Sequence, residues 1–257
     1  MKNNTSKILG VIPARYNSFR LPGKPLKLIG EKSMIQHVYE KACQSLQNVV
    51  VATDDKRILK CVESFKGNVV LTKNSHQNGT SRCLEALNNW SNKTKLEYHY
   101  VINIQGDEPL LHEDHLNKLI KCFDDSSTDF ATVALEINSQ NYPKKGKVFL
   151  VKDVNDYALY FSRNIIPYQK NYQIENAELK GKLYQHIGIY GYQKDTLKKF
   201  CSMNPSFLEK SENLEQLRWL ENGGKIKVVV TNYLSHPVDT VDDLMEVRKI
   251  YEKKHQL

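Results

Sequence analysis

Apolar and polar positions show two different patterns along the first half of the chain. Short apolar runs predict strands, and apolar residues three or four positions apart predict helices. The predicted strands are Ile8–Pro13, Val49–Ala52, Val69–Leu71, Tyr98–Ile104 and Phe130–Leu135, and the predicted helices are Met34–Leu46, Ile58–Phe65, Arg82–Trp90 and His115–Phe123. Their strict alternation implies right-handed crossovers, and hence an α/β fold with a mostly parallel sheet that helices cover on both faces.

The second half of the chain has a different pattern. It predicts an antiparallel section made of three strands: Lys147–Val151, Ala158–Phe161 and Ile187–Tyr192. A polar stretch at 169–182 separates two of these strands. Helices predicted at about 212–222 and 241–254 flank one more strand, Ile226–Val230. Because no repeat or Pro/Gly-rich linker divides the chain, we expect a single domain over 1–257 with an inserted or appended antiparallel portion.

Three polar loops each follow a predicted strand. They are the loop after Ile8–Pro13, the TDD segment at 53–55 and the QGDEP segment at 105–109. In open parallel sheets, ligands bind beyond the carboxyl ends of the strands. We therefore expect these three loops to meet on one edge of the sheet and to form the functional site.

Composition narrows the class of protein. The chain has 257 residues, of which 40% are hydrophobic and 26% charged, as in ordinary globular proteins. It contains no apolar run of about 18 residues, so we expect no membrane span. The N-terminal MKNNTSK lacks the apolar stretch of a secretory signal. Five widely spaced cysteines without a CxxC pair predict reduced thiols in a cytoplasmic protein, and neither a disulfide framework nor a zinc site.

The net charge of +8 raises the question of a nucleic-acid partner. However, the lysines are scattered, acidic residues lie between them, and there is no zinc-finger spacing or aromatic RNA-binding motif. The charge pattern favours a solvated, lysine-rich surface with a bias toward anionic substrates, and no nucleic acid.

The loop after the first strand concentrates positive charge. Arg15, Arg20 and Lys24 surround Gly23, which lets the backbone approach a ligand closely. Backbone N–H groups in such a turn bind anions, and arginine forks with a lysine point charge suit a polyphosphate. The loop matches neither GxxxxGK[ST] nor GxGxxG. Local chemistry alone leaves a polyphosphate site and a solvated basic turn equally open.

Two acidic segments are candidate metal sites. Asp107, in QGDEP, lies just beyond a buried strand, where a carboxylate is costly unless it binds a cation or hydrogen-bond donors. VDTVDD at 238–243 adds Asp239 and Asp242, one of which we expect to cap the last helix. Carboxylates together with phosphate oxygens suit Mg²⁺, whereas turn and helix capping is the structural alternative. In HEDH, we expect His112 and His115 to lie at the surface.

Taken together, the motifs resemble a known family. Eight segments occur in the order and rough spacing of the CMP-Kdo synthetases, which are 3-deoxy-manno-octulosonate (Kdo) cytidylyltransferases: PARYNSFRLPGKPL, VATDD, NGTSR, NIQGDEPLL, ALYFSRNIIPY, HIGIYGY, LEQLRWL and VDTVDDL. The resemblance extends from about residue 7 to 250. It implies a Rossmann-like nucleotidyltransferase fold and the reaction CTP + Kdo → CMP-Kdo + pyrophosphate with Mg²⁺, a step of lipopolysaccharide biosynthesis. It also implies a homodimer formed through the antiparallel portion.

The resemblance also implies roles for individual residues. The implied nucleotide-binding residues are Ala14, Arg15, Arg20, Lys24, Asn78, Gly79, Thr80 and Asp107. The implied sugar-acid residues are Gln105, Arg163, His186, Tyr190, Glu215 and Gln216. Asp107 and Asp239 are the implied metal ligands, and with Arg15 and Lys24 they form the implied catalytic set. On this basis the nucleotide portion spans about 1–135, the sugar-acid and dimerisation portion about 136–240, and a C-terminal helix 241–257.

Two segments depart from the family's usual pattern. The cytosine-reading turn is commonly Ser-Gly-Thr followed by an acidic residue, whereas this chain has Asn78-Gly79-Thr80-Ser81. SHPVDT replaces a commoner glycine-rich version but keeps Asp239. Three alternatives therefore stay open: 8-amino-Kdo as the acceptor, another 3-deoxy acid as the acceptor, and a non-catalytic relative that binds nucleotide.

Overall fold

The structure, a computed structural model, describes residues 5–137, 146–168 and 182–255. The strands are β1 (Ile8–Ala14), β2 (Leu28–Ile29), β3 (Lys32–Ser33), β4 (Asn48–Thr53), β5 (Val69–Leu71), β6 (Tyr100–Asn103), β7 (Phe130–Ile137), β8 (Phe149–Lys152), β9 (Ala158–Ser162), β10 (Leu183–Gln193) and β11 (Lys227–Thr231). The helices are α1 (Met34–Ser45), α2 (Lys56–Ser64), α3 (Gly79–Thr94), α4 (Glu113–Cys122), α5 (Lys194–Ser202), α6 (Phe207–Glu212), α7 (Gln216–Glu221) and α8 (Val241–His255), with 3-10 turns η1 (Thr5–Lys7) and η2 (Lys24–Leu26). None of the helices described is long and apolar enough to cross a membrane.

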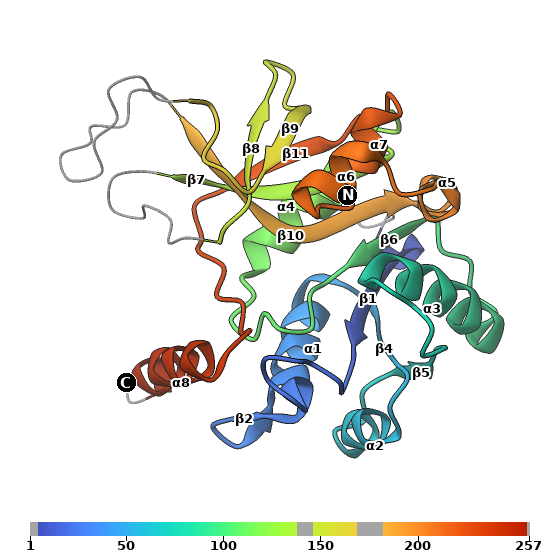
Figure 1. The fold of residues 1–257 in the computed structure, drawn as a ribbon. Coiled ribbons are helices and arrows are strands. Elements are labelled where there is room, and N and C mark those ends of the chain that lie inside the picture. Colours follow the sequence, from blue (N-terminus) through green and yellow to red (C-terminus); the bar gives the residue numbers. More distant parts are fainter. Residues whose placement is uncertain (1–4, 138–145, 169–181, 256–257) are drawn as a thin grey trace.

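One twisted sheet runs through the molecule in the order β11-β7-β10-β6-β1-β4-β5 (Figure 1). The strands β6, β1, β4 and β5 are parallel, as the alternation predicts. β10 lies between β6 and β7 and runs antiparallel to both, and it also pairs with β8 of the β8–β9 hairpin. The antiparallel portion is therefore continuous with the parallel sheet and contributes one of its central strands.

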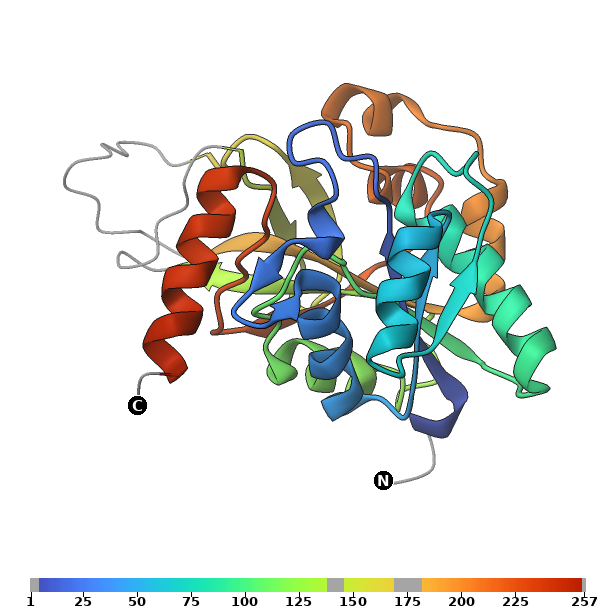
Figure 2. The same cartoon turned by 90° about the horizontal axis from the view of Figure 1, so that it is seen from below.

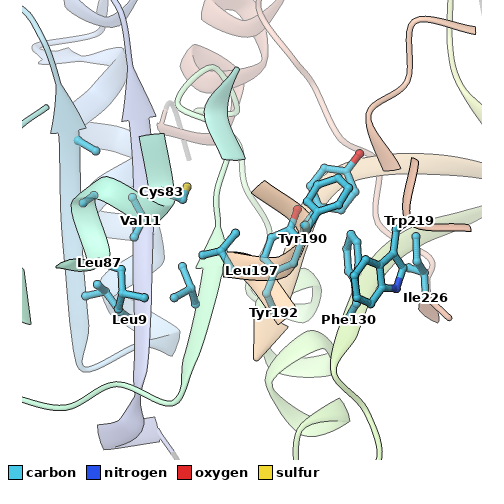
Figure 3. Close-up of a cluster of buried hydrophobic side chains, with 14 of the residues drawn as sticks. Leu9, Val11, Cys83, Leu87, Phe130, Tyr190, Tyr192, Leu197, Trp219 and Ile226 are labelled. Atoms are coloured by element: carbon cyan, nitrogen blue, oxygen red, sulfur yellow. The ribbon is translucent and has the colours of Figure 1, made fainter. Parts of the chain in front are cut away.

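Alternate side chains of the strands enter two cores. Leu9 and Val11 of β1 face the layer formed by α3, α5 and α7, and ten members of this cluster are labelled in Figure 3. Ile8 and Ile12 of the same strand face α1, α2 and α4 on the other side. This period of two explains why the strands of a sheet covered on both faces are apolar throughout.

The second half contains more helix than the sequence pattern predicts. α5 and α6 are absent from the predicted elements, and the helix predicted at 212–222 is divided between the end of α6 and α7. Asn213, with φ +52°, adopts the left-handed conformation that ends α6. β10 begins at Leu183, four residues before its predicted start. Residues 169–181, nearly all of the predicted polar stretch, lie outside the described residues.

The C-terminal segment returns to the first loop of the chain. α8 lies beside the β2–β3 hairpin in both overall views (Figures 1 and 2). Leu244 and Val247 of α8 pack with Leu21, Ile29 and Met34 in a separate small core. This packing brings the segment before α8 to the carboxyl edge of β1 and β6.

Candidate active site

Four charged side chains predicted for the site are joined by ion pairs. Lys24 Nζ lies 2.6 Å from Asp107 Oδ2 and 3.2 Å from Asp239 Oδ1, and Arg20 Nη2 lies 3.1 Å from the same Asp239 oxygen. Burial opposes the ammonium charge, but the two carboxylates outweigh it and raise the pKa of Lys24 above its ordinary value. Lys24 is therefore a firmly charged cation shared by two carboxylates.

Glycines allow the loops around these charges to come together. Gly23, with φ +66°, turns the first loop so that Lys24 begins η2. At Gly106, a Cβ atom would lie 2.8 Å from the carbonyl oxygen of Pro13. Only glycine therefore lets the turn that carries Asp107 rest against the end of β1. The TDD segment begins at Thr53, which pairs with Ala14 at the end of β1, so the expected meeting of the three loops at one edge is confirmed.

The two carboxylates form a donor set that suits a hard divalent cation. Asp107 and Asp239 are 24% and 38% exposed, and both reach one cationic nitrogen. Within the described ranges, no group of three or more His, Cys, Asp or Glu side chains is placed to hold a metal. A pair of carboxylates that leaves the remaining positions to water and phosphate oxygens is the usual Mg²⁺ arrangement in nucleotide enzymes.

The capping role expected for Asp239 or Asp242 is wrong. Asp243 Oδ2 accepts hydrogen bonds from the backbone N–H groups of Asp239 (3.0 Å) and Thr240 (2.8 Å), and Thr240 Oγ1 accepts one from the N–H of Asp243 (3.2 Å). Thr240 and Asp243 thus satisfy the start of α8 reciprocally. The carboxylate of Asp239 is left to the ion pairs with Arg20 and Lys24.

The end of β1 faces a second positive group. Ala14 is the last residue of β1, and Arg15 follows it. Arg82 of α3 is fully buried, with Nη2 3.0 Å from Asp54 Oδ2 and Nη1 2.6 Å from Thr72 Oγ1. Burial and then the charge of Arg82 lower the pKa of Arg15, and Asp54 opposes them. Two guanidinium groups with one carboxylate give this position a net attraction for anions.

The predicted cytosine turn forms the start of α3. Asn78 Oδ1 accepts a hydrogen bond from the N–H of Ser81 (2.9 Å) and so caps the helix. Behind the turn lies Asn103, at the end of β6, which the sequence interpretation missed. A Cβ at Gly79 would lie 3.6 Å from Asn103 Nδ2, and Asn103 Oδ1 is buried without a hydrogen-bond partner among the described residues.

A chain of three side chains supports this turn from its other side. Ser81 stands where the family usually has an acidic residue, and its Oγ lies 3.0 Å from Nδ1 of His76. The opposite nitrogen of His76 is hydrogen-bonded to Glu85, one helical turn beyond Ser81. The carboxylate missing at position 81 thus has a counterpart at position 85. The single sequence offered no signal for this exchange, because neither His76 nor Glu85 belongs to one of the family's motifs.

Three predicted sugar-acid residues gather where β6 ends beside β10. Gln105 Nε2 donates to the carbonyl oxygen of Gly188 (2.7 Å), and the rings of His186 and Tyr190 lie 5.3 Å apart between centroids. Thr132 Oγ1 donates its single proton to the carbonyl oxygen of Ile189 (2.8 Å). His186 Nε2, 2.9 Å from the same hydroxyl, is therefore assigned as the donor, which makes Nδ1 the acceptor. Burial lowers the pKa of His186 to about 3, so the ring is neutral.

The remaining sugar-acid candidates surround the start of α7. The hydroxyl of Thr80 donates to Glu215 Oε1, which joins the cytosine turn to α7. Glu215 Oε2 and Gln216 Nε2 are buried and have no partner within the part of the chain that the structure describes. Burial raises the pKa of Glu215. Burying a polar atom without a hydrogen-bond partner costs free energy, and a bound ligand that supplies the partner removes this cost.

Arg163 reaches the same segment from the end of β9. Its Nε donates to the carbonyl oxygen of Glu212 (2.7 Å), and Nη2 donates to that of Asn213 (3.1 Å). These bonds hold the exposed guanidinium beside the residues that precede Glu215. The structure therefore brings every predicted sugar-acid residue to the meeting point of β6, β9, β10 and α7.

The surface position expected for His115 is wrong. Its side chain is 1% exposed, and Nε2 lies 3.0 Å from the carbonyl oxygen of Tyr233. His112 accepts a hydrogen bond from the N–H of Asp114 and caps α4. The inner face of α4 packs on the segment after β11, a long-range neighbour that helical spacing cannot reveal.

Comparison with known proteins identifies the family. A family model described as cytidylyltransferase matches residues 9–226. A 3-deoxy-manno-octulosonate cytidylyltransferase of Bacteroides thetaiotaomicron is 43% identical over 260 residues, covering 96% of this chain and 99% of that protein. The protein of that name from Thermodesulfovibrio yellowstonii is 44% identical, with 93% and 96% covered.

A solved structure gives the same answer at the level of the fold. The structure of CMP:2-keto-3-deoxy-manno-octonic acid synthetase complexed with CTP superimposes with a TM-score of 0.86 at 38% identity. It covers 96% of this chain and 99% of that chain. The fold implied by the sequence motifs is thereby confirmed. This chain belongs to the cytidylyltransferase family, among the 3-deoxy-manno-octulosonate cytidylyltransferases.

Proposed function

We propose that this protein transfers CMP from CTP to Kdo and releases pyrophosphate. The observation that carries the proposal is the ion-paired set of Lys24, Asp107 and Asp239 at the carboxyl edge of the parallel strands. This arrangement offers both phosphate-binding cations and metal-binding carboxylates next to the cytosine turn. The choice of Kdo as the acceptor is supported by the names of relatives that are more than 40% identical over almost the whole chain.

Alignment and charge neutralisation account for the reaction. The sugar's anomeric oxygen attacks the α-phosphorus of CTP, its proton is released, and the bond to the bridging oxygen of pyrophosphate breaks. Arg15, Arg20 and Lys24 hold the phosphates and stabilise the charge that develops on the leaving group. Gln105 and His186 orient the sugar hydroxyls, and Arg163 pairs with the sugar carboxylate.

We assign Asp107 and Asp239 as the residues that would hold Mg²⁺. Their hard oxygens, clear of helix capping, fit this ion. When bound, Mg²⁺ neutralises phosphate charge and makes the attacking hydroxyl more acidic.

Asp107→Asn keeps the shape of the side chain and removes its charge. If this interaction lowers the barrier by about 4 kcal/mol, turnover falls about a thousandfold. CTP binding measured without metal should weaken far less, because the basic residues remain.

The structure also bears on the choice of sugar. An 8-amino acceptor carries an ammonium at its far end, and Glu209 and Glu212 are carboxylates that lie shortly before the LEQLR segment in sequence. Glu209 is paired with Arg218 (2.7 Å), and Glu212 accepts from Ser162 Oγ (2.8 Å) and the N–H of Arg163 (2.9 Å). Both are thus engaged by the protein's own donors. This supports Kdo over the amino sugar.

Pyrophosphate release from CTP is the decisive assay. With Mg²⁺ present, we expect release that depends on Kdo, and a lower kcat/KM for 8-amino-Kdo. A preference for the amino sugar above about a hundredfold, or about 2.7 kcal/mol, would reverse the choice of acceptor and leave the reaction class intact. No release from a folded protein, or equal release without sugar, would refute the enzymatic proposal.

We further propose a cytoplasmic homodimer joined through the antiparallel portion. β9 pairs only with β8 in the described sheet, and Leu159, Ile165 and Tyr168 on and after it are 62%, 41% and 88% exposed. A strand with one unpaired edge and exposed apolar side chains is a surface that proteins normally cover. All five cysteines are free thiols, which supports a reducing compartment. Light scattering after size exclusion should give twice the chain mass, and a monomer would refute the dimer.

A further inference from the structure

The carboxylate of Glu108 is buried directly beside the proposed metal ligands. Glu108 is 5% exposed and follows Asp107 in QGDEP. Its Oε1 accepts a hydrogen bond from Ser235 Oγ, and its Oε2 accepts one from the backbone N–H of His236 (3.2 Å). No role among the implied nucleotide, sugar or metal residues belongs to Glu108. A buried carboxylate is costly, so its presence calls for a reason.

The two bonds of Glu108 fall on the segment that carries Asp239. Two residues beyond His236, the backbone N–H of Val238 donates to the carbonyl oxygen of Asp107 (2.9 Å). Val238 itself is fully buried in the small core beneath α8. Three hydrogen bonds therefore join the stretch from Ser235 to Val238 to the QGDEP turn.

Asp239 follows this fastened stretch immediately. Its own N–H is held by Asp243 at the start of α8. The backbone at Asp239 is thus fixed from both sides, and its carboxylate meets Lys24 beside Asp107. The two carboxylates lie 132 positions apart in the sequence, and the bonds of Glu108 join their segments directly, in addition to the ion pairs that Lys24 makes with both carboxylates.

The side chain of Glu108 can satisfy both of its partners. A hydroxyl and a backbone N–H both present protons, and the carboxyl group has an oxygen atom for each. Glutamine offers one acceptor and one donor, and the serine hydroxyl can accept in place of donating. Ser235 belongs to SHPVDT, the segment that departs from the family's glycine-rich version, so in this chain a side-chain hydroxyl contributes to the link.

We propose that Glu108 is a positioning residue that holds the Asp239 segment against the QGDEP turn, so that Asp107 and Asp239 bind one divalent cation together. The proposal rests on the proposed function, which assigns these carboxylates to the metal. Loss of the link lets Asp239 move away from Asp107, which weakens metal binding before it weakens nucleotide binding.

The test is Mn²⁺ binding to the enzyme with CTP, measured from the EPR signal of free Mn²⁺. Ser235→Ala removes one bond and Glu108→Ala removes both, and we expect Mn²⁺ affinity to fall about tenfold or more in each. Glu108→Gln can keep both bonds and should stay within about threefold of wild type. CTP affinity without metal should be unchanged in all three variants.

A matched control separates positioning from general loss of stability. Thr196→Val removes a hydroxyl that donates to Asp129 (3.3 Å) near the start of β7, at the opposite edge of the sheet. It should lower the melting temperature and leave Mn²⁺ affinity unchanged. Unchanged Mn²⁺ affinity in Ser235→Ala and Glu108→Ala, beside a wild type that binds Mn²⁺, overturns the proposal for Glu108 alone. A wild-type enzyme without Mn²⁺ binding overturns the metal assignment as well. If Glu108→Ala does not fold, the comparison of Mn²⁺ affinity between Ser235→Ala, which should bind about tenfold more weakly, and Glu108→Gln, which should bind like wild type, tests the proposal.

Discussion

At the residue scale, Lys24 is paired with the same two carboxylates that are proposed to bind the metal ion. The chain places an ammonium between two carboxylates that also suit a divalent cation, so the two cations compete for the same oxygens. Residue types alone left phosphate or metal chemistry and a purely structural role equally open for Arg20, Lys24 and Asp107, and the family resemblance decided between them. Neither predicted that Lys24 pairs with both acids, because those partners lie 83 and 215 positions away.

Removing this ammonium should strengthen metal binding to the nucleotide-free protein. In Lys24→Met the carboxylates lose their cationic partner, and an uncompensated pair attracts a divalent ion more strongly. We expect Mn²⁺ affinity without CTP to rise about tenfold, equivalent to about 1.4 kcal/mol, while CTP affinity falls. EPR titration of Mn²⁺ measures the first quantity and calorimetry the second. Lys152→Met, which removes a remote ion pair with Asp156, is the control. Equal Mn²⁺ affinity in Lys24→Met and wild type would show that the two cations do not compete.

At the scale of elements, α3 and α7 are coupled by one hydrogen bond between the two proposed substrate regions. Thr80 belongs to the cytosine turn and Glu215 to the sugar-acid group, yet they are bonded to each other. Hydrophobic periodicity located α3 and the region of α7, but it missed α5 and α6 and predicted one helix at about 212–222, where α7 spans only Gln216–Glu221. Short helices that end at a left-handed residue such as Asn213 leave little periodic signal to detect.

The coupling predicts that a change in the nucleotide turn impairs the sugar site. Thr80→Val keeps the volume of the side chain and removes the donor to Glu215, a buried carboxyl. The free energy of unfolding should fall by about 1–3 kcal/mol. The KM for Kdo should rise along with that for CTP, whereas Thr80→Ser, which keeps the hydroxyl, should restore both. Urea unfolding and steady-state kinetics measure these effects. A KM for Kdo equal to that of wild type in Thr80→Val would contradict the coupling.

At the scale of the whole molecule, stability depends on pH through His186. Burial keeps its pKa at about 3 in the folded protein, below the ordinary value for histidine of about 6.5 in the unfolded chain. Between these two values the unfolded chain binds the extra proton. This contribution to stability is therefore complete above about pH 6.5 and is lost as the pH falls toward 3, with a slope of up to about 1.4 kcal/mol per pH unit.

A comparison of two proteins isolates this effect. On going from pH 7.5 to pH 5, wild type should lose about 2 kcal/mol more of its free energy of unfolding than His186→Asn, which has no such proton to bind. Urea unfolding at the two pH values gives the difference. Titration of the other histidines cancels because both proteins contain them. Equal losses in the two proteins would mean that His186 is readily protonated in the folded state.

The overall class of the fold follows from sequence more securely than its strand order. Alternating strands and helices predict a parallel sheet with ligand loops at one edge, and the loops after β1 and β6 do meet there. That β10 enters between β6 and β7 is not encoded in any local pattern. β10 contributes apolar side chains to both cores, as its neighbours do, so its partners are settled by tertiary packing and not by periodicity.

The central position of β10 has a consequence for biosynthesis. While the ribosome is still translating residues before 183, the nascent chain holds β6 and β7 without the strand that joins them, and both expose unpaired backbone edges. The sheet can close only after Gln193 has left the exit tunnel. Such late, long-range pairing is slow and leaves edges open to wrong partners, so we expect chaperone contact during this interval. The proposed nucleotide and sugar regions consequently fold together. We expect that a nascent chain on a ribosome stalled near residue 135 does not bind CTP.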